Sequence, residues 1–169
     1  MSRPTTLAWP ICWTSTCAKS RPADLSAAVR LLIDINVLLD VPLGRPGAAA
    51  SGRVLGTCGG PHEGWLAWHS VATLAHLVAR QSSVPGAAPL APREFIRSLL
   101  CWANVAATTK ADALVALDLP MADFEDALQA AAAMACGAQF IVTRNGRDFQ
   151  ASPVPAISPE AFLVRFGAG

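Results

Sequence analysis

Short apolar runs that resemble β-strands alternate with longer helical patterns from residue 28 almost to the end of the 169-residue chain. The strand-like runs are residues 28–33, 65–68, 105–109, 139–143 and 154–157. Alternation of this kind is typical of α/β folds, in which helices cross over between neighbouring parallel strands. It predicts one α/β domain over residues 28–169 with a mostly parallel sheet. Residues 1–27 are expected to form an irregular extension, without the continuous apolar segment of a secretory signal.

Several helix boundaries carry local signals. Asn36 and Ser70 are the residue types that cap helix N-termini, and we expect helices to begin at both. Pro92 is suited to the first position of a helix that runs to about residue 104. An alanine-rich helix over residues 123–136 should end at Gly137, and Ser158 should cap the last helix.

The composition excludes several classes of protein. Hydrophobic residues make up 53% and charged residues 15%, with a net charge of +1, which excludes a disordered chain and a broadly basic nucleic-acid-coating protein. The longest uncharged stretch, residues 127–143, is mostly alanine and shorter than the roughly 20 apolar residues of a membrane span. The five cysteines form no C-x-x-C pair and are expected to be free thiols. A cytoplasmic protein without a membrane span is therefore predicted.

Acidic and amide side chains collect next to two strand ends. Asp34 follows the first strand, and Asn145 and Asp148 follow a later one; Asp123 and Asp126 open the helix before that later strand. Sites in parallel sheets form at the carboxyl ends of strands, so these groups should share one edge. Oxygen ligands select hard cations such as Mg²⁺ or Mn²⁺, which suit phosphodiester hydrolysis. Two structural roles remain open: Asp126 as a partner of the helix dipole and Asp34 as a cap.

Basic side chains are few, so any surface for phosphate must be local. Arg144 and Arg147 flank the predicted acidic edge and are as well explained by phosphate binding as by solvation. Arg93 and Arg97 share one helical face, for which a solvated role is favoured.

The chain has five tryptophans. Aromatic side chains can stack on bases. Trp65, Trp68 and Trp102 fall within predicted elements, and core packing is the favoured role for Trp65 and Trp102.

Four segments resemble PIN-domain ribonucleases, many of which are the toxins of VapBC-type toxin–antitoxin pairs. They are LIDINVLLD (32–40), DFEDALQAAA (123–132), GAQFIVTRNGRDF (137–149) and SPVPAISPEAF (152–162). The likeness covers about residues 29–165, although residues 43–120 match only in the order of elements. It implies a three-layer α/β/α fold with a central parallel sheet of about five strands. It also implies Mg²⁺- or Mn²⁺-dependent RNA cleavage, a small antitoxin partner and a homodimer.

The resemblance also implies roles for the acidic group. The family's first acid falls on Asp34, its third on Asp126 and its fourth on Asn145, with Asp148 close behind. These four residues are the expected metal ligands. Asp123 is an additional acid that would position or activate the attacking water. Asp34, Asp123, Asp126 and Asp148 are thus the expected catalytic carboxylates.

Five further residues are expected on the substrate side. Asn36 matches a polar residue after the first acid, Thr143 matches a hydroxyl near the metal, and Arg144 and Arg147 flank the fourth position. The family's second acid, usually Glu, falls on His76, and imidazole is a poorer ligand for Mg²⁺ than for Mn²⁺. His76 is therefore expected to contact RNA phosphate or to take no part in catalysis.

Two other functions remain open. A degenerate PIN domain would bind or regulate with weak or no nuclease activity, which the missing second carboxylate favours. A response-regulator-like module also clusters acids at strand ends but needs a lysine near a late strand. The two lysines, Lys19 and Lys110, do not follow the strand at 139–143, which argues against that class.

Overall fold

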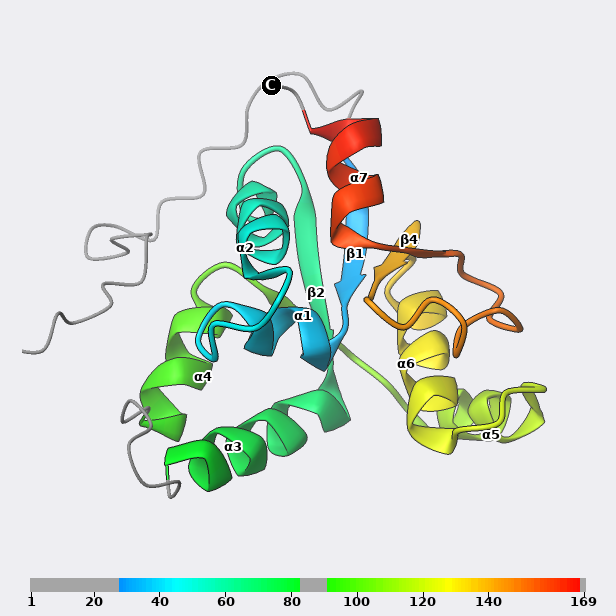
Figure 1. Ribbon diagram of the computed structural model, residues 1–169. Helices are drawn as coiled ribbons and strands as arrows, with labels where there is room; N and C mark the ends of the chain where they lie inside the picture. Colours follow the sequence, from blue (N-terminus) through cyan, green and yellow to red (C-terminus); the bar gives the residue numbers. More distant parts are fainter. Residues whose placement is uncertain (1–27, 83–90, 168–169) are drawn as a thin grey trace, which may run out of the picture.

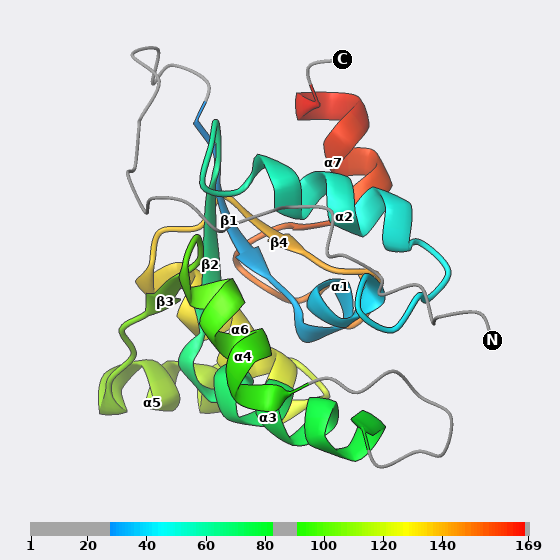
Figure 2. The ribbon, with the colours of Figure 1, turned by 90° about the vertical axis from the view of Figure 1, so that its left-hand side faces the viewer.

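The central feature of the fold is one sheet of five parallel strands (Figure 1). The computed structural model describes residues 28–82 and 91–167, so the extension predicted at residues 1–27 lies outside the described residues. The strands are β1 (Arg30–Ile33), β2 (Glu63–Ala67), β3 (Asn104–Ala106), β4 (Phe140–Val142) and β5 (Ala156–Ile157). Their order is β3-β2-β1-β4-β5, and the first four are seen together in Figure 2. The predicted parallel sheet of about five strands is confirmed.

Helices cover both faces of this sheet. They are α1 (Ile35–Asp40), α2 (Ala48–Thr57), α3 (Trp68–Ser82), α4 (Pro92–Leu100), α5 (Lys110–Asp118), α6 (Phe124–Ala135) and α7 (Pro159–Phe166). Helices α1 to α4 lie on one side of the strands in Figure 1, whereas α6, with α5 packed on it, lies on the other. The buried side chain of Phe162 joins α7 to the core on the α1–α4 side. The expected three-layer α/β/α arrangement is therefore confirmed.

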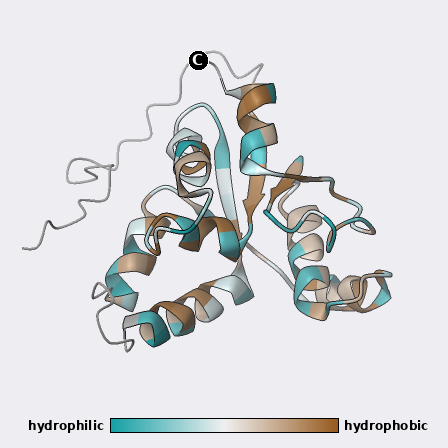
Figure 3. Ribbon diagram, in the orientation of Figure 1, coloured by the Kyte–Doolittle hydropathy of each residue, from teal (hydrophilic) through white to brown (hydrophobic). Residues whose placement is uncertain are grey.

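Strand β1 is the centre of the core because it is buried on both faces. Leu31 and Ile33 pack with the α1–α4 side, and Leu32 packs with the α6 side; all three are fully buried. Successive side chains of a strand point to opposite faces, so a continuous apolar run serves both layers. The apolar colouring of β1 and β4 in Figure 3 follows this pattern.

Three predicted helix signals are confirmed. Pro92 occupies the first turn of α4, and the Ser158 side chain accepts a hydrogen bond from the backbone N–H of Ala161 at 3.1 Å. Gly137 has a φ of +66° directly after the C-cap of α6. This left-handed conformation is the one that glycine adopts without a steric penalty at a helix C-terminus. Among the described helices, none is both long and apolar enough to cross a bilayer.

Three predicted helix boundaries are wrong. Asp34, not Asn36, holds the N-cap position of α1, and its side chain makes no cap hydrogen bond there because other partners bind it. Helix α3 begins at Trp68 rather than at Ser70, since β2 runs directly into it, and Ser70 is buried inside the helix. Helix α4 ends at Leu100 because the chain must enter β3 shortly afterwards.

Candidate functional site

Asp34 lies at the carboxyl end of β1 and is almost fully buried, with 4% of its surface exposed. Its backbone N–H donates to Val142 O at 3.0 Å, which continues the pairing of β1 with β4 past the end of the strand. The Thr143 hydroxyl donates to Asp34 Oδ2 at 2.7 Å. Gln129 Nε2 and Asn36 Nδ2 donate to Oδ1 and Oδ2, each at 3.4 Å. These three side-chain donors are neutral, so they fix the orientation of the carboxylate without neutralising its charge.

Asp123 holds the N-cap position of α6. Its Oδ1 atom accepts hydrogen bonds from the backbone N–H groups of Glu125 at 2.7 Å and Asp126 at 3.3 Å. These N–H groups have no partner within the helix, so an aspartate at the cap satisfies them. The cap orients the first turn of α6 and with it the side chain of Asp126.

Four carboxylates surround Asp126 closely enough to change its ionisation. Burial, followed in order by the negative charges of Asp123, Asp34, Asp148 and Glu125, raises the pKa of Asp126 from the ordinary 3.8 to about 6. The first three of these neighbours are the acids expected at this edge. The structure therefore brings together Asp34, Asp123, Asp126 and Asp148, which we call the acidic cluster.

Asn145 and Asp148 belong to the loop after β4. The backbone N–H of Asn145 donates to the Thr143 hydroxyl at 3.0 Å, and the N–H of Asp148 donates to Asn145 O at 3.0 Å. Thr143 thus accepts from this loop while it donates to Asp34, which ties the loop to the carboxylate on β1. Both loop side chains are exposed.

The donor set of this edge suits a hard divalent cation. The side-chain atoms that could bind a metal at this edge are oxygens, which hard cations prefer. Neighbouring carboxylates also raise one another's pKa, and a bound cation stabilises their ionised forms. Among the described residues, no three Asp, Glu, His or Cys side chains are placed to hold a metal ion by themselves. A cation would therefore need neutral oxygens, such as the Asn145 amide, or water to complete its shell.

Arg144 has partners inside the protein. Its Nη1 atom lies 3.1 Å from Oδ1 of Asp40 and donates to Pro46 O at 3.0 Å. Asp40 is fully buried and also accepts from the Ser51 hydroxyl at 2.7 Å. The ion pair between Arg144 and Asp40 was not predicted, because its two residues are far apart in the sequence. Arg147, by contrast, is exposed.

His69 lies within range of the charge of Glu125, which precedes Asp126 in the first turn of α6. His76 is exposed on α3. Burial lowers the pKa of His69, whereas the negative charge of Glu125 acts in the opposite direction. The His69 Nε2 atom is buried without a hydrogen-bond partner among the described residues. The sequence could have indicated His69, because it comes just after β2 at the same edge of the sheet as the acids.

The raised pKa of Asp126 predicts a pH-dependent stability for the metal-free protein. Between the ordinary value of 3.8 and about 6, the folded chain binds this proton more tightly than the unfolded chain does. Stability should therefore fall as the pH rises through that window, because the ionised carboxylate is partly buried and also lies beside like charges. The Asp126→Asn variant should unfold at a higher temperature than the parent at about pH 8 and lose this advantage at about pH 4.

Thermal unfolding followed by circular dichroism across this pH range measures the effect. Asp118→Asn is the matched control, because Asp118 is an exposed acid at the end of α5, outside the cluster. The control should follow the parent at every pH. An Asp126→Asn variant that also follows the parent would contradict the raised pKa of Asp126 in the folded chain.

Comparisons with known proteins agree with this architecture. The sequence matches the family model of the PIN domain over residues 30–147. The structure is similar to a chain in the crystal structure of VapBC2 from Rickettsia felis bound to a DNA fragment from their promoter. The TM-score is 0.57 at 13% identity, over 77% of this chain and 98% of that one. No curated protein matches the sequence significantly.

Proposed function

The chain belongs to the PIN-domain family, and from this premise we propose that it is a metal-dependent endoribonuclease, the toxin of a VapBC-type toxin–antitoxin pair. The observation that carries this proposal is the convergence of the acidic cluster at one edge of the sheet, where burial and four neighbouring carboxylates raise the pKa of Asp126. Carboxylates that repel one another at the carboxyl edge of a parallel sheet are stabilised by a bound cation, and a cation so held suits phosphodiester hydrolysis.

Asp34 and Asp126 would hold Mg²⁺ or Mn²⁺, with Asn145 or Asp148 completing the shell. The cation would supply a lowered pKa for the attacking water and charge stabilisation at the phosphate. Asp123 would orient this water or accept its proton through Oδ2, because Oδ1 is bound to the N-terminus of α6. Hydrogen bonds from neutral donors hold the buried Asp34 carboxylate in one orientation before substrate binds.

On the substrate side, Arg147 is the exposed cation of the loop after β4 and would contact an RNA phosphate. Arg144 would contribute through the 34% of its side chain that stays accessible beside Asp40. Thr143 and Asn36 would act through Asp34, to which both donate hydrogen bonds. His76 is exposed, so its side chain would be accessible to an RNA phosphate.

We also propose a small antitoxin and a second copy of the chain as partners. The structurally similar protein from Rickettsia felis is described as VapBC2 bound to promoter DNA. Exposed apolar side chains on this chain, such as Leu117 at 64% and Val164 at 90%, offer surface that a partner would cover.

The second candidate function is a degenerate PIN domain that binds RNA or protein without cutting. The observation in its favour is the exposed His76 at the position where the resemblance implies a glutamate. Without that carboxylate the negative charge available to a second cation is smaller, so one metal ion is favoured over two.

Removal and return of metal separate the two functions. Purified chain, free of antitoxin, should cleave total RNA in Mg²⁺ or Mn²⁺, lose all activity in EDTA and regain it when either ion is restored in excess. Gel electrophoresis of the RNA measures cleavage, and circular dichroism confirms that the EDTA-treated protein is folded. A folded protein that leaves RNA intact in both ions would support the degenerate domain. If the wild-type chain is active in Mn²⁺ but not in Mg²⁺, and the His76→Ala substitution changes this activity, His76 has a role at the metal.

A further inference from the structure

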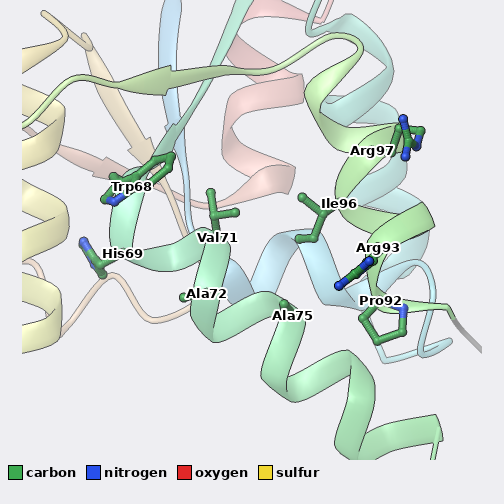
Figure 4. A pocket seen from close by; sticks show the side chains of 9 residues that line it. All are labelled: Trp68, His69, Val71, Ala72, Ala75, Pro92, Arg93, Ile96 and Arg97. Atoms are coloured by element: carbon green, nitrogen blue, oxygen red, sulfur yellow. The ribbon is translucent and has the colours of Figure 1, made fainter.

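A pocket with a volume of about 480 Å³ lies between α3 and α4 (Figure 4). Its walls are mostly apolar, with Val71, Ala72 and Ala75 contributed by α3 and Ile96 by α4. Figure 4 shows Val71 and Ile96 pointing into the space from the two helices. Binding sites for small molecules and single chemical groups have volumes of roughly 300–1,000 Å³ and mainly apolar walls.

The edges of this pocket differ from its walls. Trp68 stands at one end with 67% of its surface exposed, although tryptophan is on average a highly buried residue. Arg93 and Arg97 come from α4 on the other side. Arg97 lies 3.7 Å from Glu94, but both side chains are at least 70% exposed, so this pair holds the guanidinium weakly. The described lining includes two arginines and no acid.

The pocket opens beside the acidic cluster. Leu32 of β1 is paired with Trp65 of β2, so Asp34 is level with Ala67, and Trp68 is the next residue along β2. Neighbouring strands are about 4.8 Å apart, which places the start of the pocket one strand away from Asp34. His69 lines the pocket and also responds to the charge of Glu125 in the first turn of α6.

We propose that this pocket receives an unstacked base of a single-stranded RNA, with the base on Trp68 and the flanking phosphates on Arg93 and Arg97. The inference rests on the proposed ribonuclease function and specifies its substrate class. A cluster of carboxylates repels the RNA backbone, and the chain has a net charge of only +1, so affinity must come from local contacts. An exposed aromatic ring with neighbouring arginines is the combination that binds single strands. A base held within a duplex cannot enter such a pocket.

The test is binding of RNA to a chain that cannot cut it. A short fluorescein-labelled RNA single strand of mixed sequence is titrated with the Asp34→Asn protein in EDTA, and fluorescence anisotropy gives the Kd. Adding Trp68→Ala should weaken binding about tenfold or more, whereas Trp68→Phe should keep most of the affinity because it retains an aromatic face. Adding Arg93→Gln or Arg97→Gln should weaken binding and make the slope of log affinity against log salt shallower by about one each.

The matched controls are an exposed arginine on another helix and a duplex RNA. Arg53→Gln on α2 should leave the Kd of the Asp34→Asn protein unchanged. The duplex form of the same RNA should bind at least about tenfold more weakly than the single strand, because its bases remain stacked. Equal binding of duplex and single strand overturns the inference.

The remaining outcomes separate this inference from the proposed function. If wild-type protein cleaves RNA but Trp68→Ala leaves the Kd unchanged, the ribonuclease stands and the base pocket is wrong. The base pocket is also wrong if Trp68→Ala leaves the Kd for RNA unchanged but abolishes antitoxin binding or dissociates a dimer, as measured by light scattering. In that case a protein partner covers the pocket. If the wild type cleaves no RNA and Asp34→Asn binds none, the proposed function fails and the inference fails with it.

Discussion

The Asp34→Asn variant should lose RNA cleavage by about a thousandfold or more while it keeps its fold. The substitution preserves the size of the side chain and an oxygen that accepts from the Thr143 hydroxyl, which now lies 2.7 Å from Oδ2. It removes the negative charge that would bind the cation most directly, since Asp34 is the most buried acid of the cluster. Loss of a metal ligand removes several kcal/mol of transition-state stabilisation, and about 1.4 kcal/mol corresponds to tenfold in rate.

Initial rates on a defined RNA, with thermal unfolding of each protein, measure this effect. Asp118→Asn is the matched control, because it makes the same chemical change at an exposed acid of α5. It should cleave at the rate of the wild type. An Asp34→Asn protein with wild-type activity would remove the acidic cluster from the mechanism, and loss of activity together with loss of folding would show a structural role instead.

The Phe162→Ala variant should lower the free energy of unfolding by about 3–5 kcal/mol. Phe162 is fully buried on α7, and its ring centre lies 5.2 Å from that of His62 and 5.0 Å from that of Phe166. Its side chain joins α7 to the same core as Leu31 and Ile33 of β1. Truncation leaves a cavity and removes these ring contacts, so the large value is expected if the surrounding side chains do not collapse into the space.

Urea denaturation measures the loss, and the same helix supplies the control. Val164→Ala shortens a side chain of α7 that is 90% exposed and should change the free energy of unfolding by no more than about 0.5 kcal/mol. Equal effects of the two substitutions would mean that α7 does not pack on the sheet as described. Because none of the carboxylates of the acidic cluster belongs to α7, cleavage by folded Phe162→Ala protein should be retained.

Features that depend on local sequence could be predicted. The apolar run before Asp34 must be a central strand, because it has no polar face, and the carboxyl end of that strand then fixes where Asp34 lies. The cap at Ser158 and the left-handed Gly137 follow from residue type in the same way. These features need only the nearest few residues and the rule that parallel strands share an edge.

Features that depend on distant pairs could not be predicted. From the sequence, Arg144 is equally suited to solvent and to RNA phosphate. In the fold it lies beside the buried carboxylate of Asp40. The exposure of Trp68 follows from the start of α3 directly at the end of β2, which the sequence did not indicate. Both features depend on how helices are placed against the rest of the fold. The periodicity of apolar residues predicts the helices but not their placement.

The hydrogen bond between Thr143 and Asp34 joins residues that are 109 positions apart. Asp123, Asp126 and Asp148 likewise come from the last third of the chain, whereas their partner carboxylate stands near its beginning. During translation the first strand therefore leaves the ribosome long before the segments that complete the cluster. No nascent fragment that ends before Asp148 contains all four carboxylates. The site that these carboxylates would form can therefore be completed only after Asp148 has been synthesised.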